Sequence, residues 1–395
     1  MAPDTGMIVG VVGAGAMGSG IAHVAAAAGH QVILGDMDAD VVARARANIG
    51  KLVERDVEKG RQHRADADAL VARIVDAGVL SDGHGAFRHC GIVIEAIAEL
   101  LSAKAALFAS LECVVSDTCI LATNTSSLSI AAIAGRCREP ARVLGVHFFN
   151  PAPVMPLVEI VPGLATGADV VSRAEALVRG WKKTTVLSMD TPGFIVNRVA
   201  RPFYGESLRL LEEGVATAPT IDWAMRELGG FRMGPFELMD FIGNDINYAV
   251  TTSVFEGFFH DPRYRPSLTQ RRLVEAGMLG RKRERGYYDY RAGAQPPEPT
   301  RDEGIGRGIL DRVLAMLVNE AVEAVFMRVA LPRDIETAIT KGVSYPKGLL
   351  AWGDEIGPRV ILDRLDALQA EYGDDRYRAS ALLRRRVRDD QPLLA

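Results

Sequence analysis

The sequence predicts an α/β domain built on a parallel sheet, followed by two all-α domains. Three observations predict this architecture. Apolar runs typical of strands alternate with helical patterns up to about residue 188. A Pro-Gly turn at residues 192–193 then precedes long helical patterns, and the C-terminal part repeats the helical segment before it. At 395 residues the chain is also longer than one hydrophobic core usually serves.

The composition is that of an ordinary globular protein, with 48% apolar and 24% charged residues. The net charge of −4 gives no global reason to expect nucleic acid or an anionic membrane as partner. The N-terminus lacks a signal-peptide pattern, and no apolar run approaches the roughly 20 residues that span a bilayer. We therefore expect a cytoplasmic protein. The four cysteines show no CxxC or Cys/His ligand spacing, so the sequence predicts neither a metal site nor a disulfide framework.

Residues 7–38 have the strand, glycine turn, helix, strand order of a βαβ unit. Gly13 permits the tight turn, Gly15 lets the backbone approach a pyrophosphate, and Gly18 lets helix and strand pack closely. The following helix N-terminus offers unpaired N–H groups to phosphates. We expect the cofactor to contact the turn and the start of this helix, at Gly13, Gly15, Ala16, Met17 and Gly18. The segment therefore predicts a Rossmann-type dinucleotide-binding domain.

Asp36 ends the second strand of this unit, 21 residues after Gly15. A carboxylate at that place accepts hydrogen bonds from the adenosine ribose of a dinucleotide. It would repel a 2′-phosphate, and no arginine follows it closely. The sequence therefore favours NAD over NADP as the cofactor.

Residues 40–78 predict two charged amphipathic helices joined near Gly60, an inserted helical hairpin that is too long for a simple crossover. Most of its charges are typical of a solvated face, although its Lys and Arg residues could also meet a phosphorylated ligand.

Three further apolar runs, residues 91–99, 119–127 and 143–150, predict buried strands that end in polar residues. Ligands of an open parallel sheet bind outside the carboxyl ends of its strands. The polar groups found there are Glu99, then Asn124 to Ser127, then His147 and Asn150. We expect the site at this edge of the sheet.

The stretch GVHFFNPAPVMPLVEIVP, residues 145–162, carries His147 and Glu159 within two strand-like apolar runs. Burying ionisable groups is costly, so their presence requires an explanation. Taken alone, His147 could be a hydrogen-bonded core histidine, and Glu159 could point to solvent from an edge strand.

The sequence resembles the 3-hydroxyacyl-CoA dehydrogenase family, including bacterial 3-hydroxybutyryl-CoA dehydrogenases, from residue 7 to about residue 290. The resemblance is carried, in this order, by VVGAGAMGSGIA, ATNTSSL, GVHFFNPAPVMPLVEIV, DTPGFIVNRV, LGGFRMGPFELMDFIG and GRKRERGYYDY. It implies an NAD-binding Rossmann domain over residues 1–188 and a helical domain over residues 189–290, with an acyl-CoA substrate between them.

The resemblance also implies roles for the catalytic residues. His147 is the base for the substrate hydroxyl, and histidine suits this work because it changes protonation near operating pH. Glu159 would bind its other ring nitrogen and stabilise the imidazolium. Ser126, with Ser127 as the fallback, would hydrogen-bond the reacting oxygen, and Asn197 would lie beside the substrate. Without the resemblance, Ser126 would be a turn or N-cap residue and Asn197 a surface helix residue.

The resemblance also implies three residues that bind the cofactor or the substrate. Glu99 and Lys104 match family positions near the nicotinamide ribose, although Leu100 stands where the family more often has asparagine. That departure puts one polar contact to the cofactor in doubt. Lys59 falls where the family places a lysine on the CoA phosphates, against the alternative of a plain solvated lysine.

The resemblance thus implies reversible NAD-dependent oxidation of an (S)-3-hydroxyacyl-CoA, such as 3-hydroxybutyryl-CoA, to a 3-ketoacyl-CoA. No motif marks the acyl group. One alternative is a sugar-acid (gulonate-type) 3-dehydrogenase of the same superfamily. The other is a non-catalytic, NAD-binding structural protein like the lens crystallins of this fold.

A shift of 114 residues reveals an internal repeat of the helical domain. It aligns Arg198 with Arg312, Glu206 with Glu320, Ile221 with Ile335, Gly234 with Gly348, Asp240 with Asp354 and Gly243 with Gly357. A polar linker at residues 291–302 would separate the second copy, residues 303–395, from the first. Asp311 replaces Asn197 in the second copy, which points to a structural role.

Single-copy relatives generally dimerise through this helical domain. The sequence therefore predicts an intrachain pseudo-dimer of helical domains and a largely monomeric protein. The alternative is a homodimer formed through another face.

Overall fold

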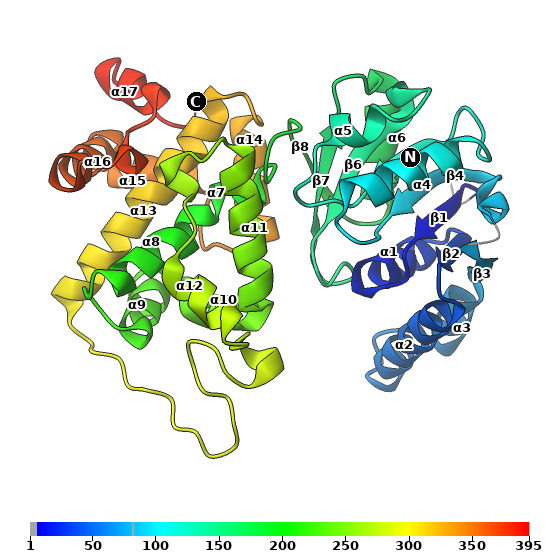
Figure 1. The fold of residues 1–395 in the computed structure, drawn as a ribbon, viewed down its shortest axis with the longest axis horizontal. Coiled ribbons are helices and arrows are strands. Elements are labelled where there is room, and N and C mark those ends of the chain that lie inside the picture. The colour runs from blue at the N-terminus through cyan, green and yellow to red at the C-terminus, as the bar shows by residue number, and fades with distance from the viewer. Residues whose placement is uncertain (1–5, 81–82, 395) are drawn as a thin grey trace. The chain divides into compact units, whose positions relative to one another are not determined.

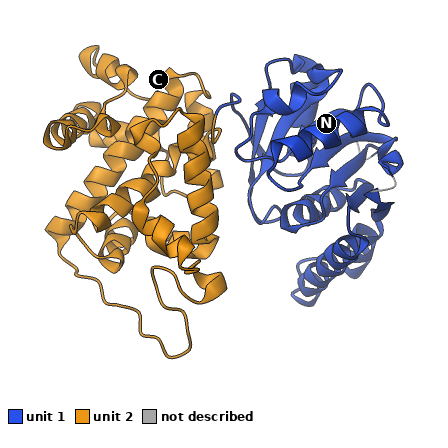
Figure 2. Ribbon diagram, viewed as in Figure 1, with its two compact units in different colours: residues 1–191 blue, residues 192–395 orange. Residues whose placement is uncertain are grey.

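The computed structural model describes residues 6–80 and 83–394 of the chain, which form two compact units, residues 1–191 and 192–395 (Figure 2). Within these described stretches no helix is long and apolar enough to cross a membrane. The cytoplasmic location stays a prediction.

The first unit is built on a sheet with the strand order β3-β2-β1-β4-β5-β6-β7-β8 (Figure 1). Its first six positions have the order of a doubly wound dinucleotide-binding fold. All neighbouring strands are parallel except β6 and β7, which are antiparallel. The strands are β1 (Ile8–Val12), β2 (Val32–Asp36), β3 (Ile74–Val79), β4 (Cys90–Glu95), β5 (Ile120–Thr123), β6 (Val143–Phe148), β7 (Leu157–Pro162) and β8 (Thr184–Leu187).

Helices cover this sheet, and one hydrophobic core joins α1, α2, α3 and α6 to its strands. Burial on both faces explains why the strands are nearly continuous apolar runs. The helices of this unit are α1 (Ala16–Ala27), α2 (Ala39–Glu58), α3 (Arg64–Ala72), η2 (Gly85–Phe87), α4 (Leu101–Glu112), α5 (Ile130–Ala134), η3 (Pro140–Arg142) and α6 (Ala168–Gly180).

The predicted helical hairpin is present as α2 and α3, but its predicted end at residue 78 is wrong. Residues 74–79 form β3, an edge strand in which Ile74 pairs with Val32 of β2. Ile74 is buried while Val75 and Val79 are exposed, which is typical of a half-covered edge. The helical spacing of apolar residues ends before this segment. Gly78 also has a φ of +79°, with which an α-helix cannot continue.

The second unit is helical and contains two copies of one arrangement. The first copy consists of α7 (Val196–Val199), α8 (Arg201–Glu212), α9 (Ala218–Trp223), η4 (Ala224–Leu228), α10 (Pro235–Ile242), α11 (Asn244–Gly257), η5 (Pro262–Tyr264), α12 (Leu268–Glu275) and η6 (Arg281–Arg283). The second copy consists of α13 (Glu303–Phe326), α14 (Pro332–Gly342), α15 (Leu349–Ile356), α16 (Pro358–Tyr372), η7 (Asp375–Tyr377) and α17 (Ala381–Arg388).

The repeat explains how these helices correspond. For example, α15 begins 114 residues after the start of α10 and ends 114 residues after its end. The single helix α13 corresponds to the pair α7 and α8. Pro202 stands in the first turn of α8, and its counterpart in α13 is Met316. Proline removes a backbone donor and interrupts a helix, whereas methionine continues it.

Both copies close a helix N-terminus with a carboxylate from the preceding helix. Asp222 accepts hydrogen bonds from the backbone N–H groups of Phe236 and Glu237, both at 2.9 Å. Its counterpart Glu336 accepts from Leu350 at 2.8 Å and Ala351 at 3.2 Å. A carboxylate at this end of a helix satisfies unpaired donors and favours the helix dipole.

The two copies contact each other reciprocally, through α7 and α8 of the first copy and α13 of the second. The Nε of Arg198 donates to Glu320 at 2.6 Å, and the Nε of Arg312, the counterpart of Arg198, donates to Glu206 at 2.6 Å. The tyrosines of η5 and η7 add matching bonds to the same two carboxylates, Tyr264 to Glu320 at 2.6 Å and Tyr377 to Glu206 at 2.8 Å. Reciprocity of this kind is the property of a twofold interface.

Candidate active site

The site begins with a buried hydrogen bond between His147 on β6 and Glu159 on β7. The two residues face each other in the antiparallel pairing, and Nδ1 lies 2.6 Å from Oε2. Their side chains are 6% and 0% exposed. Glu159 lies on an interior strand because β8 pairs with the other side of β7. The alternative in which Glu159 points to solvent from an edge strand is therefore wrong.

The hydrogen bond to Glu159 distinguishes the two ring nitrogens of His147. Because the carboxylate holds Nδ1, the ring can exchange a proton with a ligand through Nε2. The carboxylate also fixes the ring orientation. The ring of Phe149 packs 4.5 Å from that of His147, centroid to centroid.

The loop after β5 is tied to β6 beside the histidine. The side-chain oxygen of Asn124 accepts a hydrogen bond from the backbone N–H of Phe148 at 2.8 Å. Strands β5 and β6 are parallel neighbours, so the loop and His147 lie toward the same edge of the sheet.

The two candidate serines of this loop differ in their contacts. The hydroxyl of Ser127 donates to Glu99 at 3.0 Å. Ser126 donates to Glu99 through its backbone N–H, also at 3.0 Å, and its hydroxyl makes no hydrogen bond within the described residues. The half-buried hydroxyl of Ser126 therefore suits contact with a ligand better than that of Ser127.

Lys104 is buried between two carboxylates. Its Nζ lies 2.6 Å from Glu95, 3.2 Å from Glu99 and 3.4 Å from the carbonyl oxygen of Ile97. These acceptors occupy the three N–H donors of the ammonium group. Lys104 is thus suited to holding Glu99 in place rather than to contacting a ligand itself.

The charge state of Glu99 follows from these contacts. Burial acts to raise the pKa of Glu99, but the charge of Lys104 and the hydrogen bonds from Thr125 and Ser126 lower it below its ordinary value. Glu99 is thus an ionised acceptor at the carboxyl ends of the strands. Its neighbour Leu100 is exposed and supplies no polar contact.

Sequence reasoning missed two positioning residues, Glu95 and Asn124. Glu95 is fully buried, pairs with Lys104 and accepts a hydrogen bond from the Thr123 hydroxyl at 2.7 Å. Its signal was an acid closing the apolar run GIVIE, the same kind of signal that marked His147. Asn124 was noted only as one of several polar residues after the strand.

The glycine turn has the properties that a dinucleotide requires. Gly13 has a φ of +96°, and a Cβ on Gly18 would lie 1.7 Å from the carbonyl oxygen of Gly13. Both positions need glycine for the turn and for close packing. A Cβ on Gly15 would meet nothing within 4 Å, so this surface is open. Ala16 and Met17 begin α1, whose N-terminus has no side-chain cap.

Asp36 lies beside this turn with its carboxylate fixed. One oxygen accepts from the backbone N–H of Ala14 at 2.7 Å, while the other has only the Asp38 N–H at 3.3 Å. An adjacent cavity of about 340 Å³ is lined by Val12, Gly13, Asp36, Met37, Leu80, His84, Ile97, Ala103, Ala106 and Leu107. A largely apolar cavity with one carboxylate fits an adenosine group. Together with the open turn and the uncapped helix, these residues fit NAD.

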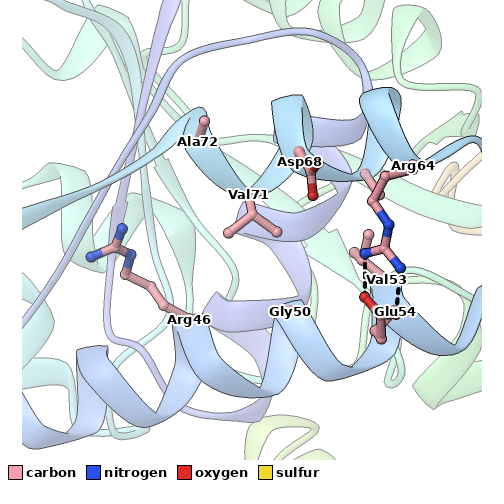
Figure 3. Close-up of a pocket in the computed structure, with 9 residues that line it drawn as sticks. Arg46, Gly50, Val53, Glu54, Arg64, Asp68, Val71 and Ala72 are labelled. Atoms are coloured by element: carbon pink, nitrogen blue, oxygen red, sulfur yellow. Dashed lines mark hydrogen bonds and ion pairs between the residues drawn. The ribbon is translucent and has the colours of Figure 1, made fainter. Parts of the chain in front are cut away.

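The remaining predicted residues lie elsewhere. Asn197 is half-buried on α7 in the second unit. Lys59 is exposed at the end of α2 and makes no ion pair with any described residue. A hollow of about 380 Å³ between α2 and α3 is lined by Arg46 and the Glu54–Arg64 pair, but not by Lys59 (Figure 3).

Comparisons with known proteins identify the family of the chain. The family described as 3-hydroxyacyl-CoA dehydrogenase, NAD binding domain, matches residues 8–191. The companion C-terminal domain of the family matches twice, over residues 193–290 and 309–392. The second match confirms the tandem helical copy that the internal repeat predicted.

Three relatives illustrate the similarity. 3-Hydroxyadipyl-CoA dehydrogenase of Escherichia coli (strain K12) is 39% identical, with 96% of this chain and 97% of that protein covered. 3-Hydroxybutyryl-CoA dehydrogenase of Bradyrhizobium diazoefficiens is 41% identical, with 74% of this chain and 98% of that protein covered. A crystal structure of 3-hydroxybutyryl-CoA dehydrogenase from Escherichia coli K12 has a TM-score of 0.90 at 37% identity, covering 96% of this chain and 98% of that one.

The matched domains extend over most of the chain in the order that the family has, and the glycine turn, Asp36 and the buried histidine–glutamate pair lie within them. The chain therefore belongs to the 3-hydroxyacyl-CoA dehydrogenase family and is an NAD-dependent oxidoreductase of that family.

Proposed function

We propose that this enzyme oxidises (S)-3-hydroxyacyl-CoA with a short acyl chain, such as 3-hydroxybutyryl-CoA, reversibly to the 3-ketoacyl-CoA. The observation that carries the proposal is the buried hydrogen bond of 2.6 Å between His147 and Glu159. A carboxylate that is 0% exposed and bonded to histidine is the arrangement that supports a general base.

The residues divide the work as follows. His147 takes the proton of the substrate hydroxyl at Nε2 and returns it in the reverse reaction, while Glu159 stabilises the imidazolium formed between these events. The Ser126 hydroxyl and the Asn197 amide hold the substrate oxygens. Glu99, fixed by Lys104, orients the nicotinamide end of the cofactor. When bound, NAD would supply the acceptor for the hydride of the hydroxyl-bearing carbon.

At the other end of the cofactor, Gly13, Gly15 and Gly18 with the first residues of α1 hold the pyrophosphate, and Asp36 accepts from the ribose. We also propose that Lys59 meets the CoA phosphates. Its exposure at the end of α2 allows a flexible cation to reach them.

The experiment that tests the function is a substrate panel. NADH formation is measured with purified enzyme, NAD and (S)-3-hydroxyacyl-CoA esters from C4 to C12, including dicarboxylic esters, with the (R)-enantiomers and L-gulonate as controls. Turnover of the (S)-esters alone supports the proposal. Turnover of gulonate alone indicates a sugar-acid dehydrogenase, and NAD binding without any turnover indicates a structural protein.

Replacing Asp36 with alanine is expected to weaken NAD binding and to shift preference toward NADP. The ribose hydroxyls lose their acceptor, and a 2′-phosphate loses its repulsion. The ratio of kcat/KM for NADPH to that for NADH checks this in the reduction of acetoacetyl-CoA. Asp38→Ala, a neighbouring exposed acid, is the control. If Asp36→Ala leaves the NADPH to NADH ratio of kcat/KM unchanged, this carboxylate does not contact the adenosine ribose.

We further propose that the protein is monomeric. The reciprocal contacts of α7 and α8 with α13 occupy in one chain the surface that a second subunit would otherwise cover. Light scattering of the intact chain is expected to give the mass of a single chain across a wide concentration range. A dimer mass at all concentrations would contradict this proposal and indicate that another face associates.

A further inference from the structure

Arg201, at the start of α8, is a buried cation without an acidic partner. Its side chain is only 6% exposed, and it forms no ion pair with any acid among residues 6–80 and 83–394. One N–H donates to the hydroxyl of Thr251 at 3.1 Å, and the guanidinium lies 4.8 Å from the ring centre of Tyr204. Its Nε has no hydrogen-bond partner among those residues. An arginine buried in this way is costly unless an anion joins it.

Tyr345 supplies a second unused donor beside this cation. Its hydroxyl is buried and has no hydrogen-bond partner in the described chain. Burial raises the pKa of Tyr345 well above its ordinary value, while the charge of Arg201 opposes that shift. Burial likewise lowers the pKa of Arg201, against the opposing influence of Tyr204 and Tyr345. The Nε–H of Arg201 and the hydroxyl of Tyr345 are thus two buried donors that lack an acceptor among the described residues.

The internal repeat shows that helical packing does not need these polar groups. Each one has an apolar counterpart in the other copy, at the position related by 114 residues. Arg201 corresponds to Ala315, Tyr204 to Val318, Thr251 to Leu365 and Tyr345 to Phe231. All four counterparts are buried, so apolar side chains fill the equivalent places. Arg201, Tyr204 and Thr251 belong to the first copy, the copy that carries Asn197, and Tyr345 is contributed by the second copy.

Arg201 lies close in the chain to Asn197. It stands four residues after Asn197, at the start of α8, and Ala200 joins the two helices with φ −83° and ψ −4°. Four residues further along α8 is Gly205, where an added Cβ would meet nothing within 4 Å. The surface at Gly205 is therefore open.

We propose that Arg201, with the hydroxyl of Tyr345 beside it, binds a carboxylate at the far end of the acyl chain, so that the preferred substrates are dicarboxylic 3-hydroxyacyl-CoA esters. This inference rests on the proposed function. A guanidinium and a phenol O–H are strong donors to a carboxylate in a water-poor site. In a six-carbon dicarboxylic ester the carboxyl carbon stands three carbons beyond the hydroxyl-bearing carbon.

The test compares two (S)-esters of equal length, 3-hydroxyadipyl-CoA and 3-hydroxyhexanoyl-CoA, which differ only in a terminal carboxyl or methyl group. The wild-type enzyme is expected to have the larger kcat/KM with the dicarboxylic ester. Arg201→Met is expected to lower the ratio of the two kcat/KM values by about 100-fold, chiefly through KM of the dicarboxylic ester, because it removes a buried charge partner.

Two further variants sharpen this test. Arg307→Met makes the same change at an exposed arginine of α13 and is expected to leave the ratio unchanged. Tyr345→Phe introduces the side chain of its own counterpart, Phe231, so folding is preserved even if Arg201→Met fails to fold. Loss of one hydrogen bond to a charged group is expected to lower the ratio by about 10-fold.

Some outcomes overturn the inference. The inference is contradicted if the ratio of the two kcat/KM values is unchanged in both Tyr345→Phe and folded Arg201→Met. It is also contradicted if these variants lower kcat/KM equally for both esters. In either case the cluster has only a structural role. If the wild-type enzyme turns over the neutral ester as well as the dicarboxylic one, the inference falls while the proposed function stands. If it turns over neither ester, both fall together.

Discussion

Replacing His147 with glutamine is expected to lower kcat by about 10²- to 10⁴-fold while NAD binding stays nearly intact. Glutamine can still hydrogen-bond Glu159, but it cannot accept the proton of the substrate hydroxyl. The cofactor contacts proposed at the glycine turn and Asp36 do not involve this side chain. Steady-state kcat with acetoacetyl-CoA and NADH, together with a fluorescence titration of NADH, measures both parts of the prediction.

The matched variant is Glu159→Gln, which keeps the geometry of the 2.6 Å hydrogen bond and removes the charge. It is expected to lower kcat by a related amount, because the imidazolium loses its stabilising carboxylate. Near-wild-type turnover in folded His147→Gln would remove His147 from the mechanism. An unaltered rate in Glu159→Gln alone would leave Glu159 with a structural role.

Replacing Glu320 with alanine is expected to lower the free energy of unfolding of the helical unit by about 3–5 kcal/mol. Glu320 is 2% exposed and accepts from Arg198 and Tyr264, both at 2.6 Å. The variant leaves the buried guanidinium of Arg198 without its carboxylate. Urea unfolding followed by circular dichroism measures the change.

The control is Glu303→Ala, which breaks an exposed pair with Arg307 in the same helix, α13. An exposed pair of this spacing contributes about 0.3–0.5 kcal/mol. If the two variants have similar unfolding free energies, the contacts between the two copies are not a major source of stability. A large effect of Glu320→Ala alone agrees with a reciprocal interface that holds the copies together.

Much of the fold could be predicted because its signals are local. The glycine spacing and the acid at Asp36 define the first βαβ unit, and the repeat of 114 residues defines the two helical copies. His147 and Glu159 stood out because ionisable groups in apolar runs require compensation. Their partnership could be proposed only from the family pattern, because the register that sets them opposite each other depends on how β6 pairs with β7.

Other features depend on contacts between distant residues and left no local signal. The position of β3 depends on its pairing with β2. The helical pattern that precedes β3 in the sequence gave no indication of this pairing. Lys104 was identified, but its link to Glu95 requires the folded sheet edge. Arg201 belongs to none of the site residues predicted from the sequence, and only its burial without an acidic partner distinguishes it. Burial and pairing of this kind are tertiary properties.

The consumption of NADH after addition of acetoacetyl-CoA to the purified intact chain tests the central claim most directly. The histidine–glutamate pair, the serine of the β5 loop and the asparagine of α7 predict sustained turnover that is lost in His147→Gln. If NADH binds but none is consumed with acetoacetyl-CoA or any other 3-ketoacyl-CoA, the claim that this site is catalytic is contradicted.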